Sequence, residues 1–160
     1  MSPLNCLEKP ERELVITRLL EARPERVFKA WTDPTQLRQW WGPNGFTAPV
    51  CEIEARPGGR LRIVMRAPDG AEYPMTGIVR EIAAPGRLVF TNIPVDEKGD
   101  ALLDGLTAVT FGDAGARTKL TVESRAVGIG RVAHVARMLD GMDAGWAQTI
   151  DRLAAYVAGR

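Results

Sequence analysis

The chain has 160 residues, and its 21 basic and 20 acidic side chains leave a net charge of +1, without the basic excess typical of nucleic-acid-binding proteins. This length suits a single domain that folds without a metal or a disulfide, and Cys6 and Cys51 form no CxxC pair. No stretch reaches the roughly 18 apolar residues of a membrane span, and the N-terminus has no signal-peptide core, so we expect a cytoplasmic protein with no membrane span.

The N-terminal third predicts an arm, a strand and two short helices. Residues 1–11 carry two prolines and no periodicity, so we expect a flexible arm ahead of one domain over 12–160. Residues 13–20 are rich in β-branched and aliphatic side chains, which is typical of a strand. Pro24 suits the first turn of a helix, and Asp33, followed by proline, provides the N-cap of a second one.

The middle of the chain reads as short strands separated by turn signals. Six strands are predicted, at 46–55, 60–66, 72–82, 87–93, 107–112 and 117–125. The turns between neighbours are mostly short, which permits only antiparallel pairing. The segment 94–105 is too long for a hairpin loop, and we expect it to be a mobile excursion at one end of the sheet.

The C-terminal part predicts one long amphipathic helix. Apolar side chains recur there at intervals of three and four residues, forming a single stripe of Leu139, Met142, Trp146, Ile150, Leu153 and Val157. Such a helix needs an apolar surface to cover. The sequence therefore predicts an α+β fold, in which a curved seven-stranded antiparallel sheet packs against the helix and the two short helices lie between strands 1 and 2.

Several motifs, taken together and in order, resemble a known family. They are Val27-Phe28-Lys29-Ala30-Trp31-Thr32-Asp33-Pro34, Leu37, Trp40-Trp41-Gly42-Pro43, Gly45-Phe46, Arg56-Pro57-Gly58-Gly59, Pro68-Asp69-Gly70 with Tyr73, Arg87-Leu88-Val89-Phe90-Thr91, Gly145-Trp146 and Asp151-Arg152-Leu153. This set is similar to the bacterial proteins named after the activator of the heat-shock-protein-ninety ATPase, in the START and birch-pollen-allergen (SRPBCC) superfamily. The resemblance implies a helix-grip fold with an internal cavity. It also implies the superfamily's range of functions, from binding lipids, polyketides, hormones or antibiotics to cyclisation and hydrolysis.

Catalytic and metal-binding motifs are scarce. His134 is the only histidine, which excludes a multi-histidine metal centre, and no nucleophile motif such as GxSxG accompanies it. Glu52 and Glu54 share one face of a strand, and we interpret them as an exposed charged face. Cys51 is interpreted as an inert strand thiol. We predict no cofactor and no metal.

Large aromatic and methionine side chains favour a binding pocket. Methionines adapt to irregular space, and a Tyr hydroxyl or Trp N–H offers a polar handle. Trp40 and Trp41 point about 100° apart around a helix, so one of them should face the cavity while the other packs or stays exposed. For a cavity of about 300–1,000 Å³, we predict the lining residues Trp40, Met65, Tyr73, Met75, Phe90, Met142 and Trp146.

The leading functional prediction is a protein that binds an apolar, aromatic or polycyclic small molecule, for sequestration or transport. A cyclase-type or hydrolase-type enzyme is one alternative, and it needs an acid or base such as Tyr73 inside the cavity. A co-chaperone-like interaction module is the other, and it needs a contiguous exposed apolar patch. The same kind of patch would serve a homodimer, so a chaperone partner and a second copy of the chain both stay open.

Overall fold

The structure is a computed structural model that describes residues 12–128 and 133–159, with side chains from residue 137 onward in the second range. The predicted arm at 1–11 lies outside the described residues. In chain order the elements are β1 (Arg12–Leu20), α1 (Pro24–Thr32), α2 (Pro34–Trp40), β2 (Thr47–Ile53), β3 (Arg60–Arg66), β4 (Glu72–Ala83), β5 (Arg87–Pro94), β6 (Leu103–Ala114), β7 (Arg117–Gly128), α3 (Ala133–Asp140) and α4 (Met142–Val157).

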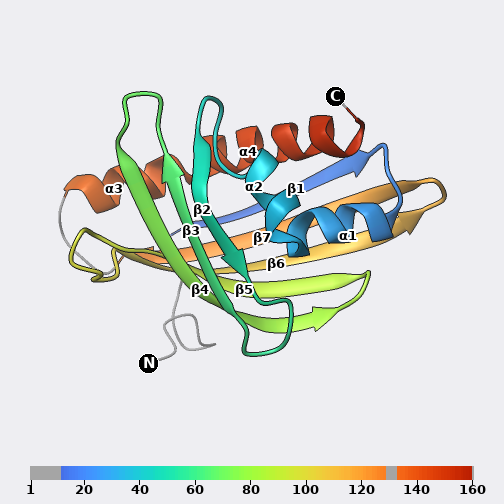
Figure 1. The fold of residues 1–160 in the computed structure, drawn as a ribbon, viewed down its shortest axis with the longest axis horizontal. Coiled ribbons are helices and arrows are strands. Elements are labelled where there is room, and N and C mark those ends of the chain that lie inside the picture. Colours follow the sequence, from blue (N-terminus) through green and yellow to red (C-terminus); the bar gives the residue numbers. More distant parts are fainter. Residues whose placement is uncertain (1–11, 129–132, 160) are drawn as a thin grey trace.

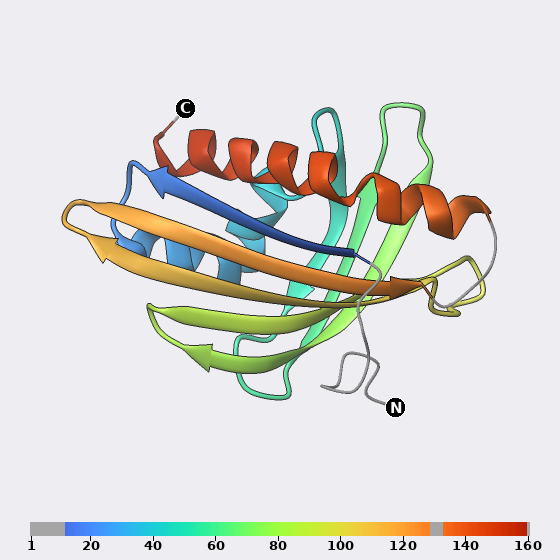
Figure 2. The ribbon, with the colours of Figure 1, turned by 180° about the vertical axis from the view of Figure 1, so that it is seen from behind.

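The seven strands form one curved antiparallel sheet in the order β1-β7-β6-β5-β4-β3-β2. The first two strands in sequence therefore lie at opposite edges, and α1 and α2 connect them. Helices α3 and α4 run along one side of the sheet, with α3 at the end opposite α1 (Figures 1 and 2). The predicted α+β fold is confirmed, including its strand number and the two short helices after the first strand.

The largest differences from the prediction lie at the start of β6 and within the C-terminal helix. Strand β6 begins at Leu103 rather than 107, and the predicted excursion is short, because Val95 still bridges Ala101 across the loop. The predicted single C-terminal helix is divided at Gly141, a residue that costs about 1 kcal/mol in a helix relative to alanine. Backbone hydrogen bonds from Gly141 to Arg137 and from Gly145 to Gly141 continue on both sides of the break.

Two capping interactions fix α1 and α2. The predicted N-cap is confirmed, since Asp33 Oδ1 accepts hydrogen bonds from the backbone N–H and the hydroxyl of Thr35 at 3.0 and 2.7 Å. These bonds, the side-chain one first, lower the pKa of Asp33. At the end of α1 the carbonyl of Ala30 lacks its usual helical donor, because Pro34 has no N–H. The indole N–H of Trp40 supplies that hydrogen bond at 3.0 Å.

An aromatic cluster occupies most of the space between the sheet and α4. Its centre is Trp31, which is 1% exposed. The rings around Trp31, at centroid distances of 4.8–6.4 Å, are those of Trp40, Trp41, Phe90, Phe111 and Trp146. This cluster decides how much hollow space is left for a ligand.

Candidate functional site: a methionine-lined pocket

An apolar pocket of about 180 Å³ lies between the aromatic cluster and α3. We call it the methionine pocket, because four of the chain's five methionines line it. Its lining residues come from both layers of the fold and are Trp41, Gly42, Pro43, Met65, Met75, Asn92, Pro94, Leu103, Ala126, Met138, Met142, Gly145, Trp146 and Thr149. Among the described residues of this lining, no side chain is an acid, a base, a thiol or a phenol.

The sheet and the helix each place side chains in the pocket through the regular spacing of residues along a strand or a helix. Alternation along each strand sends every second residue toward the helices, which places Met65 of β3 and Met75 of β4 on the inner face. In α4, Met142, Trp146 and Thr149 follow at intervals of four and three, so they share one helical face. The pocket is thus formed by the inner face of the sheet and the inner face of α4.

Four of the seven predicted lining residues, Met65, Met75, Met142 and Trp146, lie in this lining, and three do not. Phe90 is buried in the aromatic cluster. Tyr73 lies near the start of β4, 36% exposed, with its ring 6.1 Å from that of Phe46. Trp40 is fully buried by its bond to Ala30, so its neighbour Trp41 faces the pocket instead.

The pocket is smaller than the 300–1,000 Å³ expected from the sequence. The reason is that the tryptophan and phenylalanine rings pack against one another and fill the wider part of the hollow. A cavity of about 150 Å³ holds a benzene molecule in other proteins. A space of about 180 Å³ therefore fits a compound of one ring with a short substituent rather than a polycyclic molecule.

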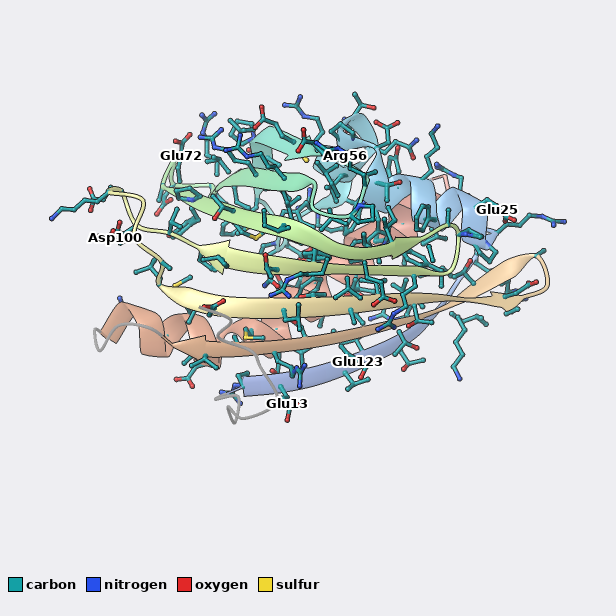
Figure 3. The ribbon with its side chains drawn as sticks, turned by 90° about the horizontal axis from the view of Figure 1, so that it is seen from below. Glu13, Glu25, Arg56, Glu72, Asp100 and Glu123 are labelled. Carbon is teal, nitrogen blue, oxygen red and sulfur yellow. The ribbon has the colours of Figure 1, made fainter. Side chains whose placement is uncertain are left out.

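A wider hollow of about 460 Å³ adjoins the pocket and shares Pro94 and Met138 with it. Its remaining walls include the acidic residues Glu72, Asp96 and Glu97. In Figure 3 the labelled Glu72 and Asp100 lie at the same end of the molecule. Three carboxylates therefore line the hollow that adjoins the apolar pocket.

Arg152 of α4 holds one wall of the pocket in place. Its guanidinium donates to the carbonyl oxygens of Trp41, Gly42 and Pro43 at 3.2, 2.9 and 3.0 Å. Partial burial lowers the pKa of Arg152. In the sequence this arginine stands out only as a member of the motif Asp151-Arg152-Leu153. Its signal in the sequence is a basic residue three positions after Thr149, on the pocket side of the helix.

Asn92 is a polar residue of the lining, and it was not among the residues predicted from the sequence. Its Oδ1 accepts a hydrogen bond from the hydroxyl of Thr107 at 2.8 Å, and Thr107 Oγ1 lies 2.9 Å from the hydroxyl oxygen of Ser124. The signal was present in the alternation of β5, where Leu88, Phe90 and Asn92 share the inner face. A polar residue at an inward position predicts a buried hydrogen-bond network.

The other residues weighed for chemistry lie away from this pocket. Cys51 borders a groove that also includes Arg60 and Arg62, and burial raises the pKa of its thiol to about 11, so the thiol stays protonated at neutral pH. Glu52 and Glu54 are exposed, as predicted. Within the described ranges, no three His, Cys, Asp or Glu residues gather to hold a metal ion. His134 falls in α3, and its side chain lies outside the described part.

Exposed large apolar side chains are scattered. Over residues 12–128 and 137–159 they are Val15, Leu19, Tyr73 and Ile78. The first two belong to β1 and the last two to β4, and three strands separate β1 from β4. In this part of the chain there is also no helix with the length and apolar character needed to cross a membrane.

Comparison with known proteins gives consistent matches across nearly the whole chain. The sequence profile of the family described as Activator of Hsp90 ATPase homolog 1-like protein matches residues 21–158. A protein of Arthrobacter aurescens, solved by NMR, is 28% identical with a TM-score of 0.82, over 92% of this chain and 87% of its own. A Chromobacterium violaceum protein is 26% identical with a TM-score of 0.79, over 93% and 99% of the two chains. A Silicibacter pomeroyi protein is 26% identical with a TM-score of 0.75, over 91% and 97%. No curated protein matches the chain.

Proposed function

This chain belongs to the family of activator of Hsp90 ATPase homolog 1-like proteins, and we propose that it binds a small, largely apolar molecule in the methionine pocket. The observation that carries the proposal is the pocket itself, a partly open apolar space of about 180 Å³ between the inner face of the sheet and α4. Tightly packed interiors have few voids larger than a water molecule. An apolar hollow of this size gains free energy when a matching ligand fills it.

The character of the lining supports binding over acid–base catalysis. A cyclase-type or hydrolase-type enzyme needs a group that gives or takes a proton within reach of its substrate. Tyr73, the candidate acid or base, lies outside the lining and is partly exposed. Methionine side chains instead adapt to ligands of different shape, which suits a receptor for a class of compounds.

The scattered exposed apolar residues give the interaction-module alternative little support. Val15 and Leu19 stand on one edge strand, and Ile78 lies on β4, with β5, β6 and β7 between them. An interface with a chaperone or a second copy of the chain usually has an apolar core. We therefore propose the methionine pocket, rather than an exposed apolar patch, as the functional site.

Filling the pocket tests the proposal. Ala126 lines the pocket from β7, whereas Ala108 lies on the outer face of β6 in a separate groove. Single-ring apolar probes should raise the melting temperature of the wild type, since a ligand at 100 times its Kd adds about 2.7 kcal/mol of stability. We expect Ala126→Leu to abolish that shift and the control Ala108→Leu to retain it.

Native mass spectrometry of the wild type with the same probes reads binding directly, including the case in which Ala126→Leu does not fold. Failure of every probe to bind the wild type, or equal binding to wild type and folded Ala126→Leu, would contradict the proposal.

A further inference from the structure

The inner face of the sheet carries a buried chain of polar side chains that ends at the methionine pocket. Ser124 of β7 and Thr107 of β6 are both 0% exposed, and they stand opposite each other in the sheet register. Thr107 donates to Oδ1 of Asn92 on β5, and Asn92 lines the pocket. This hydrogen-bond network therefore runs from the buried Ser124 to Asn92 at the methionine pocket.

Counting hydroxyl protons decides which group donates and which accepts in each hydrogen bond of this network. Each hydroxyl has one proton to donate. Because the proton of Thr107 goes to Asn92 Oδ1, the proton of Ser124 goes to Thr107 Oγ1. With the amide of Asn92 reversed, the Ser124 proton would have no acceptor among the described residues, at a site that water does not reach. The network thus fixes the amide of Asn92 with its oxygen toward Thr107.

The other half of the same amide is left for a ligand. Within the described part of the chain no group accepts a hydrogen bond from Asn92 Nδ2, which carries two donors. Gly105 makes room for this arrangement, since a Cβ there would lie 2.7 Å from Nδ2 and 2.4 Å from the carbonyl oxygen of Asn92. Thr149, the hydroxyl residue of the lining, is occupied by a bond to the carbonyl of Gly145 at 2.8 Å.

We propose that the methionine pocket selects neutral carbonyl compounds, such as aryl ketones, whose oxygen accepts a hydrogen bond from Asn92 Nδ2. This inference rests on the proposed function and specifies its ligand class. A donor next to an apolar pocket is costly to leave unpaired once a ligand displaces water. A neutral acceptor satisfies the donor, whereas a carboxylate would lose water in a pocket whose described lining residues include no cation.

A matched pair of probes isolates the carbonyl. Acetophenone and ethylbenzene have nearly the same size and differ by one oxygen. Titrations followed by the methionine methyl NMR signals report entry into the pocket, because Met65, Met75, Met138 and Met142 all line it. The measured quantity is the ratio of the ethylbenzene Kd to the acetophenone Kd. We expect Asn92→Leu to lower that ratio about 3- to 10-fold, the range of one net hydrogen bond.

Asn44 provides the control, because its side chain is exposed in the turn before β2. Asn44→Leu should leave the Kd ratio unchanged. If Asn92→Leu does not fold, the NMR signal of the Asn92 side-chain amide in the wild type tests the hydrogen bond to the carbonyl instead. We expect acetophenone to shift that signal downfield and ethylbenzene to leave it in place.

The outcomes separate the two proposals. Binding of both probes with the same Kd ratio in wild type and Asn92→Leu, or an Asn92 amide signal that responds equally to both probes, overturns the selection of carbonyl compounds and leaves apolar binding standing. Methionine signals that respond to neither probe overturn both proposals.

Discussion

At the residue scale, the two adjacent tryptophans show how one hydrogen bond sets the pocket wall. Pro34 removes the N–H that would have bonded the carbonyl of Ala30, and Trp40 replaces that donor. Its ring is therefore turned into the core, and Trp41 is turned toward the pocket. Helical periodicity predicts that only one of the two faces the cavity. It does not say which, because the choice depends on an unpaired carbonyl, that of Ala30, in a different helix.

A pair of matched substitutions tests this role. Trp40 and Trp31 are both almost fully buried, but the indole N–H of Trp31 has no hydrogen-bond partner. Trp40→Phe leaves the carbonyl of Ala30 unpaired, whereas Trp31→Phe removes a donor that was already unpaired. We expect Trp40→Phe to lower the free energy of unfolding by about 1–3 kcal/mol more than Trp31→Phe. Urea denaturation measures the difference, and equal losses would show that the Trp40 bond contributes nothing to stability.

At the element scale, glycine has opposite roles in helix and sheet. Gly145 lies within α4, where a Cβ would approach only Pro43, at an ordinary contact distance of 4.0 Å. Gly77 lies within β4, where a Cβ would fall 1.9 Å from the carbonyl oxygen of Thr91. The sheet is bulged between Val79 and Glu81 along the same pair of strands. The glycine in β4 therefore permits a close strand approach in a region where the sheet bends.

Alanine at these two positions should change stability in opposite directions. Gly145→Ala should raise the free energy of unfolding by up to about 1 kcal/mol, because alanine is the better helix former. Gly77→Ala should lower it, since the strands must separate to admit the methyl group. Thermal denaturation compares the stability of each variant with that of the wild type. A destabilised Gly145→Ala would contradict the prediction and mean that the helix face at Gly145 is more crowded than its contacts indicate.

The elements themselves were largely predictable, and the reasons are local. Turn signals and apolar periodicity belong to short stretches of chain, so the strands and the stripe of α4 can be read directly from the sequence. The start of β6 and the break at Gly141 were missed, because strand length and helix continuity depend on partners far along the chain. Asn92 was missed for a related reason, since its importance lies in Thr107 and Ser124 on two other strands.

At the scale of the whole molecule, Arg152 joins the C-terminal helix to the N-terminal half. It binds three carbonyls of the segment 41–43, more than a hundred residues away in sequence. The size of the cavity is also a property of the whole fold, because helices, sheet and aromatic cluster all contribute to it. Composition predicts that a pocket exists, but the volume depends on how six rings pack together.

Replacing Arg152 should loosen this connection. We expect Arg152→Met to lower the free energy of unfolding by about 1.5–3 kcal/mol, the range for a hydrogen bond to a charged group, and to speed amide exchange in the segment 41–46. Arg18→Met is the matched control, because it removes an exposed ion pair with Asp151, worth at most about 1 kcal/mol. Equal effects of the two substitutions would contradict a structural role for Arg152.

The sheet order has a consequence for how the protein emerges from the ribosome. Strand β1 is made first, yet it pairs only with β7, whose first residue follows about a hundred positions later. At roughly 5–20 residues per second, translation leaves β1 without its partner for about 5–20 s. During that interval its apolar residues Leu14, Ile16 and Leu20 are uncovered, so the newborn chain passes through a stage in which an unpaired apolar strand is open to aggregation.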